Sequence, residues 1–506
     1  MPTILFGGLT EAHGILIRAF FEGLGYPTIT LPIPDNEDFK VGKTYCNKGQ
    51  CNPVYYTAGN LIRFLMERKA RGERDIEERY VFITAGSCGP CRFGMYEAEY
   101  RKALRDAGFR DFRVIALQQG DALVKNLNML GFPLEKKHYT SLAKSIILGD
   151  LINNIYYKIK PYEITKESAD NWKQNSLLLI YRFLRDKRPL RKALRTAFKE
   201  LTRIDLDYSI PKPKVKIIGE FFSQIQEGDS SYHMPSWLIE EGAEPLVEPL
   251  TTWVDYLIWG KLQFTWERAF RSILGTFKLM VILKLLKISI HLLYNYYRLL
   301  LGNRPDPLSS QRRIAAHANP YYNTKLRGGE GHMEVGKHIH SIKNKKAHMV
   351  ISLKPFGCMP STQSDGVQTK VSGDLGDGLF VSIETTGDAE VNIKSRVLMK
   401  LQEAKKKAME EYQEALKSLN LENLLENYQN KSLNKSLYGC LLRPKPVILK
   451  ASTRLPHHYC TTTANALYYT AGLNSFQKKL LKLLTYSFQK TLSGQSSHPE
   501  KSQVEH

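Results

Sequence analysis

The sequence predicts an α/β protein with two parallel-sheet, Rossmann-like domains, a helical linker between them, and a helical C-terminal extension that is partly disordered. Short apolar runs typical of buried strands alternate with longer amphipathic stretches typical of helices, and this alternation predicts parallel sheets. The pattern occurs twice, at 1–138 and at 211–400. A basic helical stretch, 139–210, separates the two occurrences. Residues 401–506 begin with a helix and then become rich in lysine and serine.

The first α/β unit begins with a strand at Thr3–Phe6. Thr10 is a suitable N-cap for the helix that follows, and Gly25 closes this helix before a second strand. After a polar loop, a further helix is expected over about Tyr56–Lys69. Two more strands are expected in this unit, at Tyr80–Thr84 and Phe112–Leu117. The resulting order of strands and helices is that of a doubly wound sheet.

The second unit follows Pro211 and Pro213. It is expected to contain a strand at Val215–Phe222, a helix at Met234–Glu241, a strand ending near Pro249 and a strand at His348–Leu353. Between these elements we expect one long basic helix over 261–301. The apolar run inside it, Ile273–Leu293, contains Lys278, Lys284, Lys287 and His291. Charged side chains of this kind make the insertion of a membrane-spanning helix energetically unfavourable. We therefore expect an amphipathic helix that packs on the protein or rests on a partner.

Two cysteines stand at the centre of the first unit. Cys88 and Cys91 follow the apolar run Tyr80–Thr84 in a turn rich in glycine and proline, and a helix comes next. In open α/β sheets, ligands bind at the carboxyl ends of the strands. A helix N-terminus also lowers the pKa of a nearby thiol and stabilises a thiolate. The alternative is a pair of buried structural cysteines, although the flanking glycines and proline offer the sulfur atoms little to pack against.

Three other cysteines extend this set. Cys46 and Cys51 lie in a polar loop before a helix, and Cys358 lies past a strand end, as Cys88 and Cys91 do. Cys46, Cys51, Cys88 and Cys91 would supply a closed zinc site with four thiolate ligands. Iron–sulfur clusters use the same ligand type, so spacing alone does not choose between the two metals.

Composition restricts the setting. The chain has seven cysteines and no secretory-signal pattern, so we expect a cytoplasmic, reducing environment in which clustered cysteines indicate metal binding or catalysis. The net charge of +22 suits an acidic protein partner, a coenzyme A ester, nucleic acid or an anionic membrane. No glycine-rich phosphate loop is present, so we expect neither a dinucleotide site nor ATP hydrolysis by this chain alone.

Five segments, in order along the chain, carry a resemblance to a known family. They are KTYCNKGQCNPVYYTAGNLIRFL, TAGSCGPCRFGMYEAEYRKALRDAGF, GEFFSQIQEGDSSYHM, LRGGEGHMEVGK and KPFGCMPSTQSDGVQTKV. The chain resembles the family related to 2-hydroxyacyl-CoA dehydratases and benzoyl-CoA reductases. More closely, it resembles the dehydratase-like half of the large CoA enzyme activase-related proteins, over about residues 1–410.

The resemblance implies two α/β domains around an oxygen-sensitive iron–sulfur cluster, either a 4Fe–4S or a double-cubane cluster. Cys51 of QCNP, Cys91 of GPCRFG and Cys358 of PFGCMP match the family's three cluster cysteines, with Cys88 as the alternative to Cys91. The resemblance also implies an ATP-dependent activator protein on a separate chain that delivers an electron. A lyase or reductase reaction on a CoA thioester, and a homo- or hetero-dimer, are further expectations.

Several polar residues in glycine-rich loops are candidates for contact with a substrate, although such residues more often form turns: Glu227, Asp229, His233, Glu330 and His332. Two other functions stay open. One is a non-catalytic iron–sulfur protein for electron transfer or partner binding, which a missing substrate pocket would favour. The other is a zinc-stabilised scaffold. We expect no nucleic-acid partner, and contact with a membrane surface is the less favoured alternative.

Overall fold

The computed structural model describes residues 1–86, 91–117, 136–208, 210–267, 273–326, 329–376, 379–418, 447–448 and 454–455. The chain divides into two compact units. One comprises Met1–Asp205 with Lys212–Lys407, and the other comprises Leu206–Pro211 with Ala408–His506. The predicted α/β class is confirmed, because the first unit holds two four-stranded parallel sheets. In the second unit, β9 (Val447–Ile448) pairs antiparallel with β10 (Arg454–Leu455).

The first sheet has the strand order β2-β1-β3-β4. Its strands are β1 (Thr3–Phe6), β2 (Thr28–Thr30), β3 (Tyr80–Ala85) and β4 (Arg113–Leu117). Its helices are α1 (Glu11–Gly23), α2 (Asn36–Tyr45), α3 (Asn52–Ala70), α4 (Ile76–Arg79), the 3₁₀ turn η1 (Arg92–Met95) and α5 (Tyr96–Asp106). The Thr10 side chain caps α1 by accepting a hydrogen bond from the His13 backbone N–H, as the sequence predicted.

Helices cover both faces of this sheet, because side chains of a strand alternate between its two faces. Leu5 and Phe82 point to one face, where they pack with residues of α3 and α5 such as Leu61. Ile4 and Val81 point to the other face and pack with α1. The sheet is therefore buried on both sides, as a parallel sheet requires.

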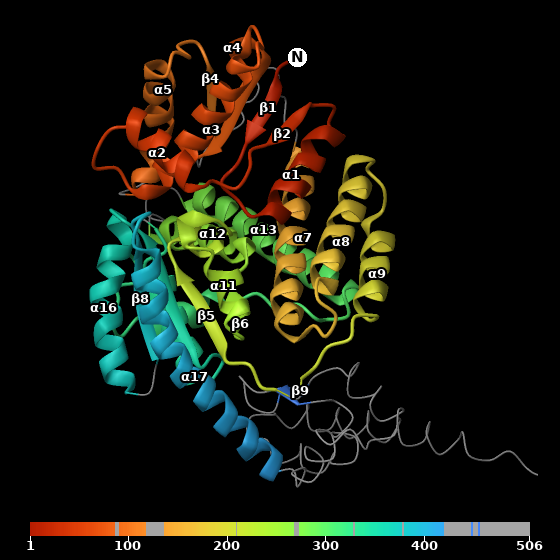
Figure 1. Ribbon diagram of the computed structural model, residues 1–506, viewed down its shortest axis with the longest axis vertical. Coiled ribbons are helices and arrows are strands. Elements are labelled where there is room, and N and C mark those ends of the chain that lie inside the picture. Colours follow the sequence, from red (N-terminus) through yellow and green to blue (C-terminus); the bar gives the residue numbers. More distant parts are fainter. Residues whose placement is uncertain are drawn as a thin grey trace, which may run out of the picture. The chain divides into compact units, whose positions relative to one another are not determined.

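The stretch 139–210, expected as a helical linker, is mainly helical as far as Leu201. It forms α7 (Lys136–Ile159), the 3₁₀ turn η2 (Lys160–Tyr162), α8 (Ser168–Arg185) and α9 (Leu190–Leu201). Figure 1 shows α1, α7, α8 and α9 side by side, each packed on the next. This stretch thus builds one wall of the first unit.

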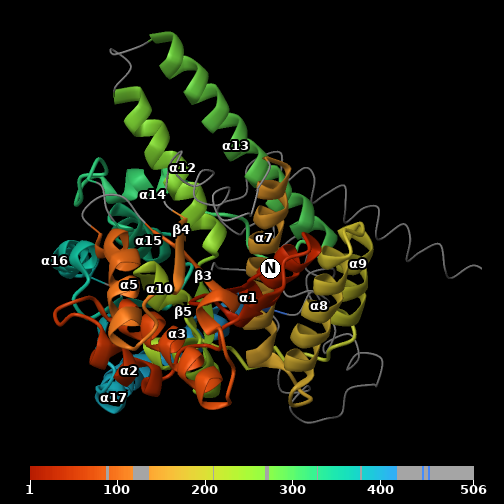
Figure 2. The same ribbon diagram turned by 90° about the horizontal axis from the view of Figure 1, so that it is seen from above.

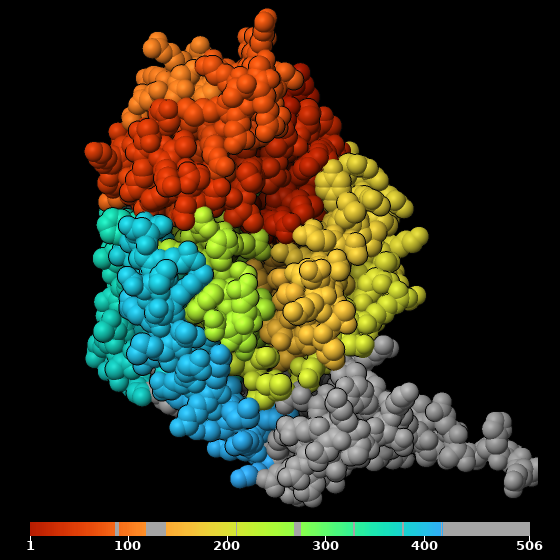
Figure 3. Space-filling view, viewed as in Figure 1, coloured from red at the N-terminus to blue at the C-terminus, as the bar shows by residue number. Residues whose placement is uncertain are grey.

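The second sheet has the order β6-β5-β7-β8. Its strands are β5 (Lys214–Gly219), β6 (Glu244–Val247), β7 (Met349–Pro355) and β8 (Leu379–Thr385). Its helical elements are α10 (Phe221–Ile225), η3 (Asp229–Ser231), α11 (Met234–Glu240), α14 (Gln311–Ala318), α15 (His332–Lys343), α16 (Met359–Leu375) and α17 (Glu390–Ser418). Figure 3 shows the N-terminal residues in red packed directly against residues of this second half in green and cyan.

The expected strand Val215–Phe222 is too long at its end. β5 stops at Gly219, and Glu220 then caps the short helix α10 by accepting a hydrogen bond from the Ser223 backbone N–H. Gly219 has φ of +123°, and a Cβ atom there would lie 1.9 Å from the Leu353 carbonyl oxygen. Only glycine fits this turn, so the strand ends there and Glu220 is directed to the carboxyl edge of the sheet.

The stretch 261–301, expected as one basic helix, belongs to two helices. These are α12 (Leu250–Glu267) and α13 (Ile273–Leu300), and they pack against each other. Lys287 and His291 of α13 both bind the Asp255 carboxylate of α12, with N···O distances of 3.1 Å. This tertiary contact, which periodicity cannot reveal, pairs the two helices. None of the helices in the described parts of the chain is both long and apolar enough to cross a membrane.

Candidate functional site

A cavity of about 680 Å³ lies where the carboxyl ends of strands from both sheets meet. Its walls come from the ends of β1, β3, β5 and β7, from the first residues of α3 and α16, and from one side of α12. Most of the lining is aromatic or aliphatic. The polar or reactive side chains in the lining include Cys51, Thr57, Thr84, Cys91, Glu220, Lys261, Gln263, Glu267, Thr324, Lys325, Glu330 and Cys358. A volume of this size is typical of small-molecule sites.

Three of the cysteines singled out in the sequence line this one cavity: Cys51, Cys91 and Cys358. Each is the residue that precedes a helical element, since Cys51 caps α3, Cys91 caps η1 and Cys358 caps α16. The local sequence explains two of these positions, because Pro53 and Pro360 stand in the first turn of their helices, where proline is favoured. The fold therefore brings together thiols that are far apart in the sequence.

Backbone contacts between the two halves hold the Cys51 loop against the Cys358 loop. The Asn52 backbone N–H donates to the Phe356 carbonyl oxygen at 3.1 Å, and the Asn52 side chain donates to the Thr385 carbonyl oxygen at 2.7 Å. A Cβ atom at Gly357, which has φ of +77°, would lie 3.5 Å from the Cys51 Cα atom. The first and second sheets thus meet beside these two cysteines.

Hydroxyl groups lie beside two of the sulfur atoms. The Cys51 Sγ atom is 3.0 Å from the Tyr96 hydroxyl, and the Cys358 Sγ atom is 3.3 Å from the Ser361 hydroxyl. Ser361 in turn donates to the Glu334 carboxylate at 2.9 Å. The Tyr96 hydroxyl can donate a hydrogen bond to the Cys51 sulfur when that thiol is deprotonated, whereas the Cys358 thiol donates to the Ser361 hydroxyl oxygen.

Burial raises the pKa of the Cys51 thiol and of the Cys358 thiol, and the nearby Glu220 carboxylate adds to the increase at both. The Tyr96 hydroxyl and the Arg92 guanidinium oppose this effect at Cys51. A helix start alone does not make these two positions favourable for a free thiolate, because loss of solvation outweighs the helix dipole. A positive ion bound between the thiols would reverse this balance.

Two carboxyl groups line the same cavity. Burial raises the pKa of Glu220 to about 7, with a further contribution from Glu334. Burial also raises the pKa of Glu330 well above its usual value, and here both Glu220 and Glu334 contribute. The Phe221 backbone N–H donates to Glu330 at 3.1 Å, which links the two acids through the first turn of α10. Near neutral pH these groups can hold and release protons.

Of the catalytic candidates from the sequence, Glu330 lines the cavity, whereas Glu227, Asp229, His233 and His332 are not part of its lining. His332 is buried directly behind the wall, where its ring packs edge-on against Tyr256 and Trp259. Burial lowers the pKa of His332 to about 4, so the ring is neutral at physiological pH.

The loop candidates of the second half form structural contacts. Glu227 accepts hydrogen bonds from the Glu11 backbone N–H at 2.8 Å and from the Lys173 ammonium at 3.3 Å, which ties this loop to α1 and α8. The His233 ring is bound to Asp229 at 2.7 Å. Their polar groups are thus used by the fold itself.

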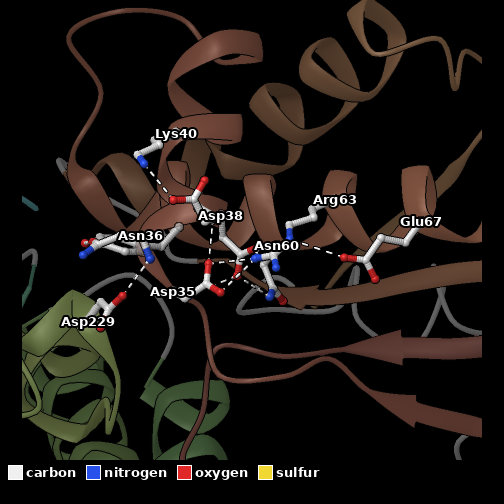
Figure 4. A network of polar contacts seen from close by, with 10 residues as sticks. Asp35, Asn36, Asp38, Lys40, Asn60, Arg63, Glu67 and Asp229 are labelled. Carbon is white, nitrogen blue, oxygen red and sulfur yellow. Dashed lines mark hydrogen bonds and ion pairs between the residues drawn. The ribbon is translucent and has the colours of Figure 1, made fainter.

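Asp229 also joins a network in the first half (Figure 4). Its carboxylate accepts a hydrogen bond from the Asn36 backbone N–H at 2.8 Å, at the start of α2. Behind it, Arg63 binds both Asp35 and Asp38 at distances of 2.8 and 3.1 Å. The network fixes the N-terminus of α2 on α3, and α3 carries Cys51 at its start.

The four cysteines of the alternative zinc site do not all reach the cavity. Cys46 is buried in the core beside the polar loop, and burial raises the pKa of its thiol to about 12. Cys88 lies outside the described residues. Among the residues that are described, no group of three or more His, Cys, Asp or Glu side chains is arranged as a metal site.

Glu220 was missed in the sequence because it was assigned to a strand. The signal that could have found it is Gly219 directly before it, since a glycine at the carboxyl end of a parallel strand starts a turn at the ligand-binding edge. Comparison with known proteins found no family model that matches the chain and no curated protein with significant similarity.

Proposed function

We propose that the chain binds an iron–sulfur cluster through Cys51, Cys91 and Cys358 and works as a redox component of the 2-hydroxyacyl-CoA dehydratase type. The observation that carries this proposal is the presence of these three thiols, from three separate loops, in the lining of one cavity. The same three cysteines match the motifs of the family that the sequence resembles. A thiolate set drawn from both halves is suited to a cluster at the junction of the two sheets.

The chemistry of the three thiols suits such a cluster. Three thiols can ligate three irons, and the charge of the bound iron would offset the effect of burial on Cys51 and Cys358. The Tyr96 hydroxyl is placed to donate a hydrogen bond to the Cys51 sulfur, and such hydrogen bonds tune the reduction potential of a cluster. When bound, the cluster would supply one-electron chemistry and Lewis acidity.

The chain's own residues would hold the substrate and its protons. The apolar wall of α12, with Trp253, Tyr256 and Leu257, suits an acyl chain and excludes water from it. Lys261 and Lys325 also line the cavity and suit the negative charge of a coenzyme A thioester. That a coenzyme A thioester is the substrate is part of this proposal.

Proton transfer falls to the two cavity acids. Glu220, with a pKa of about 7, and Glu330, with a pKa well above its usual value, can each carry a proton to a departing hydroxyl group. The Glu334 carboxylate does not line the cavity, and it accepts hydrogen bonds from Ser361 and Ser364. It therefore acts by positioning α16 and its capping residue Cys358.

The cavity also bears on the rival functions. A protein that only carries electrons needs no substrate chamber, so the large apolar cavity favours the catalytic version of the proposal. For a zinc scaffold, Cys46 would have to leave the core, where its side chain is buried.

The direct test is anaerobic reconstitution of the full chain with iron and sulfide, followed by metal and sulfide analysis and visible spectroscopy. We expect a cluster that is lost or greatly depleted in Cys51→Ala, Cys91→Ala and Cys358→Ala. Cys46→Ala is the matched control, because Cys46 is a buried cysteine outside the cavity, and it should keep the cluster. Cys88→Ala distinguishes the two adjacent candidates. Iron binding that ignores the three substitutions, or binding of zinc alone, would contradict the proposal.

The partner is tested next. We expect reduction of the reconstituted protein by an ATP-dependent activator on a separate chain, followed by paramagnetic spectroscopy. Reduction that is independent of activator and ATP would leave an electron-transfer protein and exclude the coupled mechanism. The purified chain alone should hydrolyse no ATP.

A further inference from the structure

Helices α12 and α13 lie side by side and extend away from both sheets at the ends that flank residues 268–272 (Figure 2). The pair is held at its base by the contacts of Asp255 with Lys287 and His291. One side of α13 packs against the rest of the unit. Its buried residues occur every three or four positions: Ile290, Tyr294 and Tyr297, and then Leu301 directly after the helix. This spacing is that of one helical face.

The opposite side of α13 is exposed and almost wholly apolar. We call it the α13 apolar face, and it consists of Phe277, Val281, Leu285, Ile288, Leu292, Tyr296 and Leu299. Leu285 is 57% exposed, and Phe277 and Leu292 are each 66% exposed. At 1.5 Å per residue the face runs for about 33 Å along the helix. An exposed apolar face of this extent marks an interaction surface.

The charges on α13 identify the partner surface. The helix contains no Asp or Glu from Ile273 to Leu300, and Lys278 and Lys284 are exposed beside the apolar side chains. Aromatic residues stand toward both ends of the pair's outer surface, with Trp266 and Phe277 near one end and Tyr296 near the other. Apolar residues with lysines at the edge and aromatic rings at the ends are the pattern of a helix that lies in a membrane interface.

We propose that the α13 apolar face docks in the plane of an anionic lipid surface, with Phe277, Leu285 and Leu292 in the acyl boundary and Lys278 and Lys284 at the headgroups. A second copy of the chain is the weaker occupant. Two α13 faces brought together would place these lysines opposite one another, and α13 offers no carboxylate to neutralise them. Lipid phosphates supply that negative charge.

This inference does not depend on the proposed function, but the two are connected through α12. One side of α12 lines the cavity, and α13 packs along the same helix. Docking would therefore bring the cavity wall close to the lipid surface.

The test is flotation of the full chain with vesicles of neutral phosphatidylcholine and with vesicles containing about one third phosphatidylglycerol. We expect binding to the anionic vesicles that weakens as salt is raised. The double variant Lys278→Gln with Lys284→Gln should bind the anionic vesicles more weakly, by about fivefold per lysine. Its interaction with the neutral vesicles should equal that of the wild type. The double variant Leu285→Glu with Leu292→Glu should bind neither the anionic nor the neutral vesicles, because its carboxylates would have to enter the acyl boundary.

Met399→Glu is the matched control. Met399 is an exposed apolar side chain on α17, far along the chain from α13, and its replacement should leave binding unchanged. All substituted side chains are exposed, so melting temperatures should match the wild type. Unaltered vesicle binding by the Leu285/Leu292 variant would overturn the proposal. The proposal would also be overturned if the full chain did not bind anionic vesicles and instead formed a dimer that Leu285→Glu with Leu292→Glu dissociates. A second copy of the chain would then cover the α13 apolar face.

Discussion

Glu248 should be among the most sensitive charged residues in the second half. It follows β6 and is buried between Lys216 of β5 and Lys337 of α15, with a contact to Lys337 of 3.8 Å. The two ammonium groups hold its pKa well below the usual range, against the effect of burial. The three side chains join the strand that leads to Glu220 to the helix that begins beside Glu330.

Glu248→Gln keeps the volume but leaves two lysines with little compensation in a buried site. Breaking a buried ion pair by removing one partner costs about 3–5 kcal/mol of unfolding free energy. The matched control is Glu403→Gln, because Glu403 and its partner Lys400 are each 50% exposed and 3.9 Å apart. Its loss should cost less than about 1 kcal/mol.

Chemical and thermal denaturation of the two variants beside the wild type measure the difference. The pKa of Glu248 is lowered in the folded state, so its contribution to stability is present above the unfolded-state pKa and is lost as pH falls through the folded-state pKa. The difference in unfolding free energy between the wild type and Glu248→Gln should accordingly become smaller in strong acid. The double variant Glu248→Gln with Lys337→Met should recover part of the loss. Equal stabilities of Glu248→Gln and Glu403→Gln at neutral pH would refute this reasoning.

Two further predictions concern glycines of α3 and α16 and the cavity acid Glu220. Gly59→Ala should lower the free energy of unfolding by at least about 3 kcal/mol, because a Cβ atom there would lie 1.8 Å from the Asp38 carbonyl oxygen. Gly366 in α16 has open space around it, so Gly366→Ala should raise the free energy of unfolding by about 0.5–1 kcal/mol. Thermal melts of both variants measure the two effects. The pKa of Glu220 is raised to about 7, so its contribution to stability is lost as pH rises from its unfolded value through 7. Glu220→Gln should therefore gain stability relative to wild type between pH 5 and pH 8, on the order of 1–3 kcal/mol; a constant difference across that range would exclude the raised pKa.

The strands of the first sheet were predictable because their signals are local. The apolar run that begins at Tyr80 and the short run Thr3–Phe6 are bounded by turn residues, and both appear as strands with these starts. The helix expected from about Tyr56 starts instead at Asn52. Its first turn contains Pro53, which is compatible with a helix start and therefore does not interrupt it.

The division of 261–301 between two helices was not predictable from periodicity. The lysines of this stretch indicated one basic helix, but Lys287 of α13 binds Asp255 on α12. A contact between two helices depends on the tertiary fold, which periodicity along one segment does not contain.

The location of the candidate site was partly predictable. Cys91 and Cys358 follow strand ends, and the carboxyl edge of a parallel sheet is where ligands bind. What the sequence did not reveal is that Glu220 joins them, because its role depends on the turn at Gly219. The opposite error affected Glu227, whose loop position is used for contacts with α1 and α8.

The two sheets have the same connectivity, since β2-β1-β3-β4 and β6-β5-β7-β8 are one order written twice. In that correspondence Cys91 and Cys358 are equivalent, because each follows the third strand of its half and precedes a helical element. Cys51 is the N-cap residue of α3, and Glu330 directly precedes Gly331, the N-cap residue of α15. The cavity is thus a pseudosymmetric centre between two copies of one strand order, and three thiols and the Glu330 carboxylate lie in its lining.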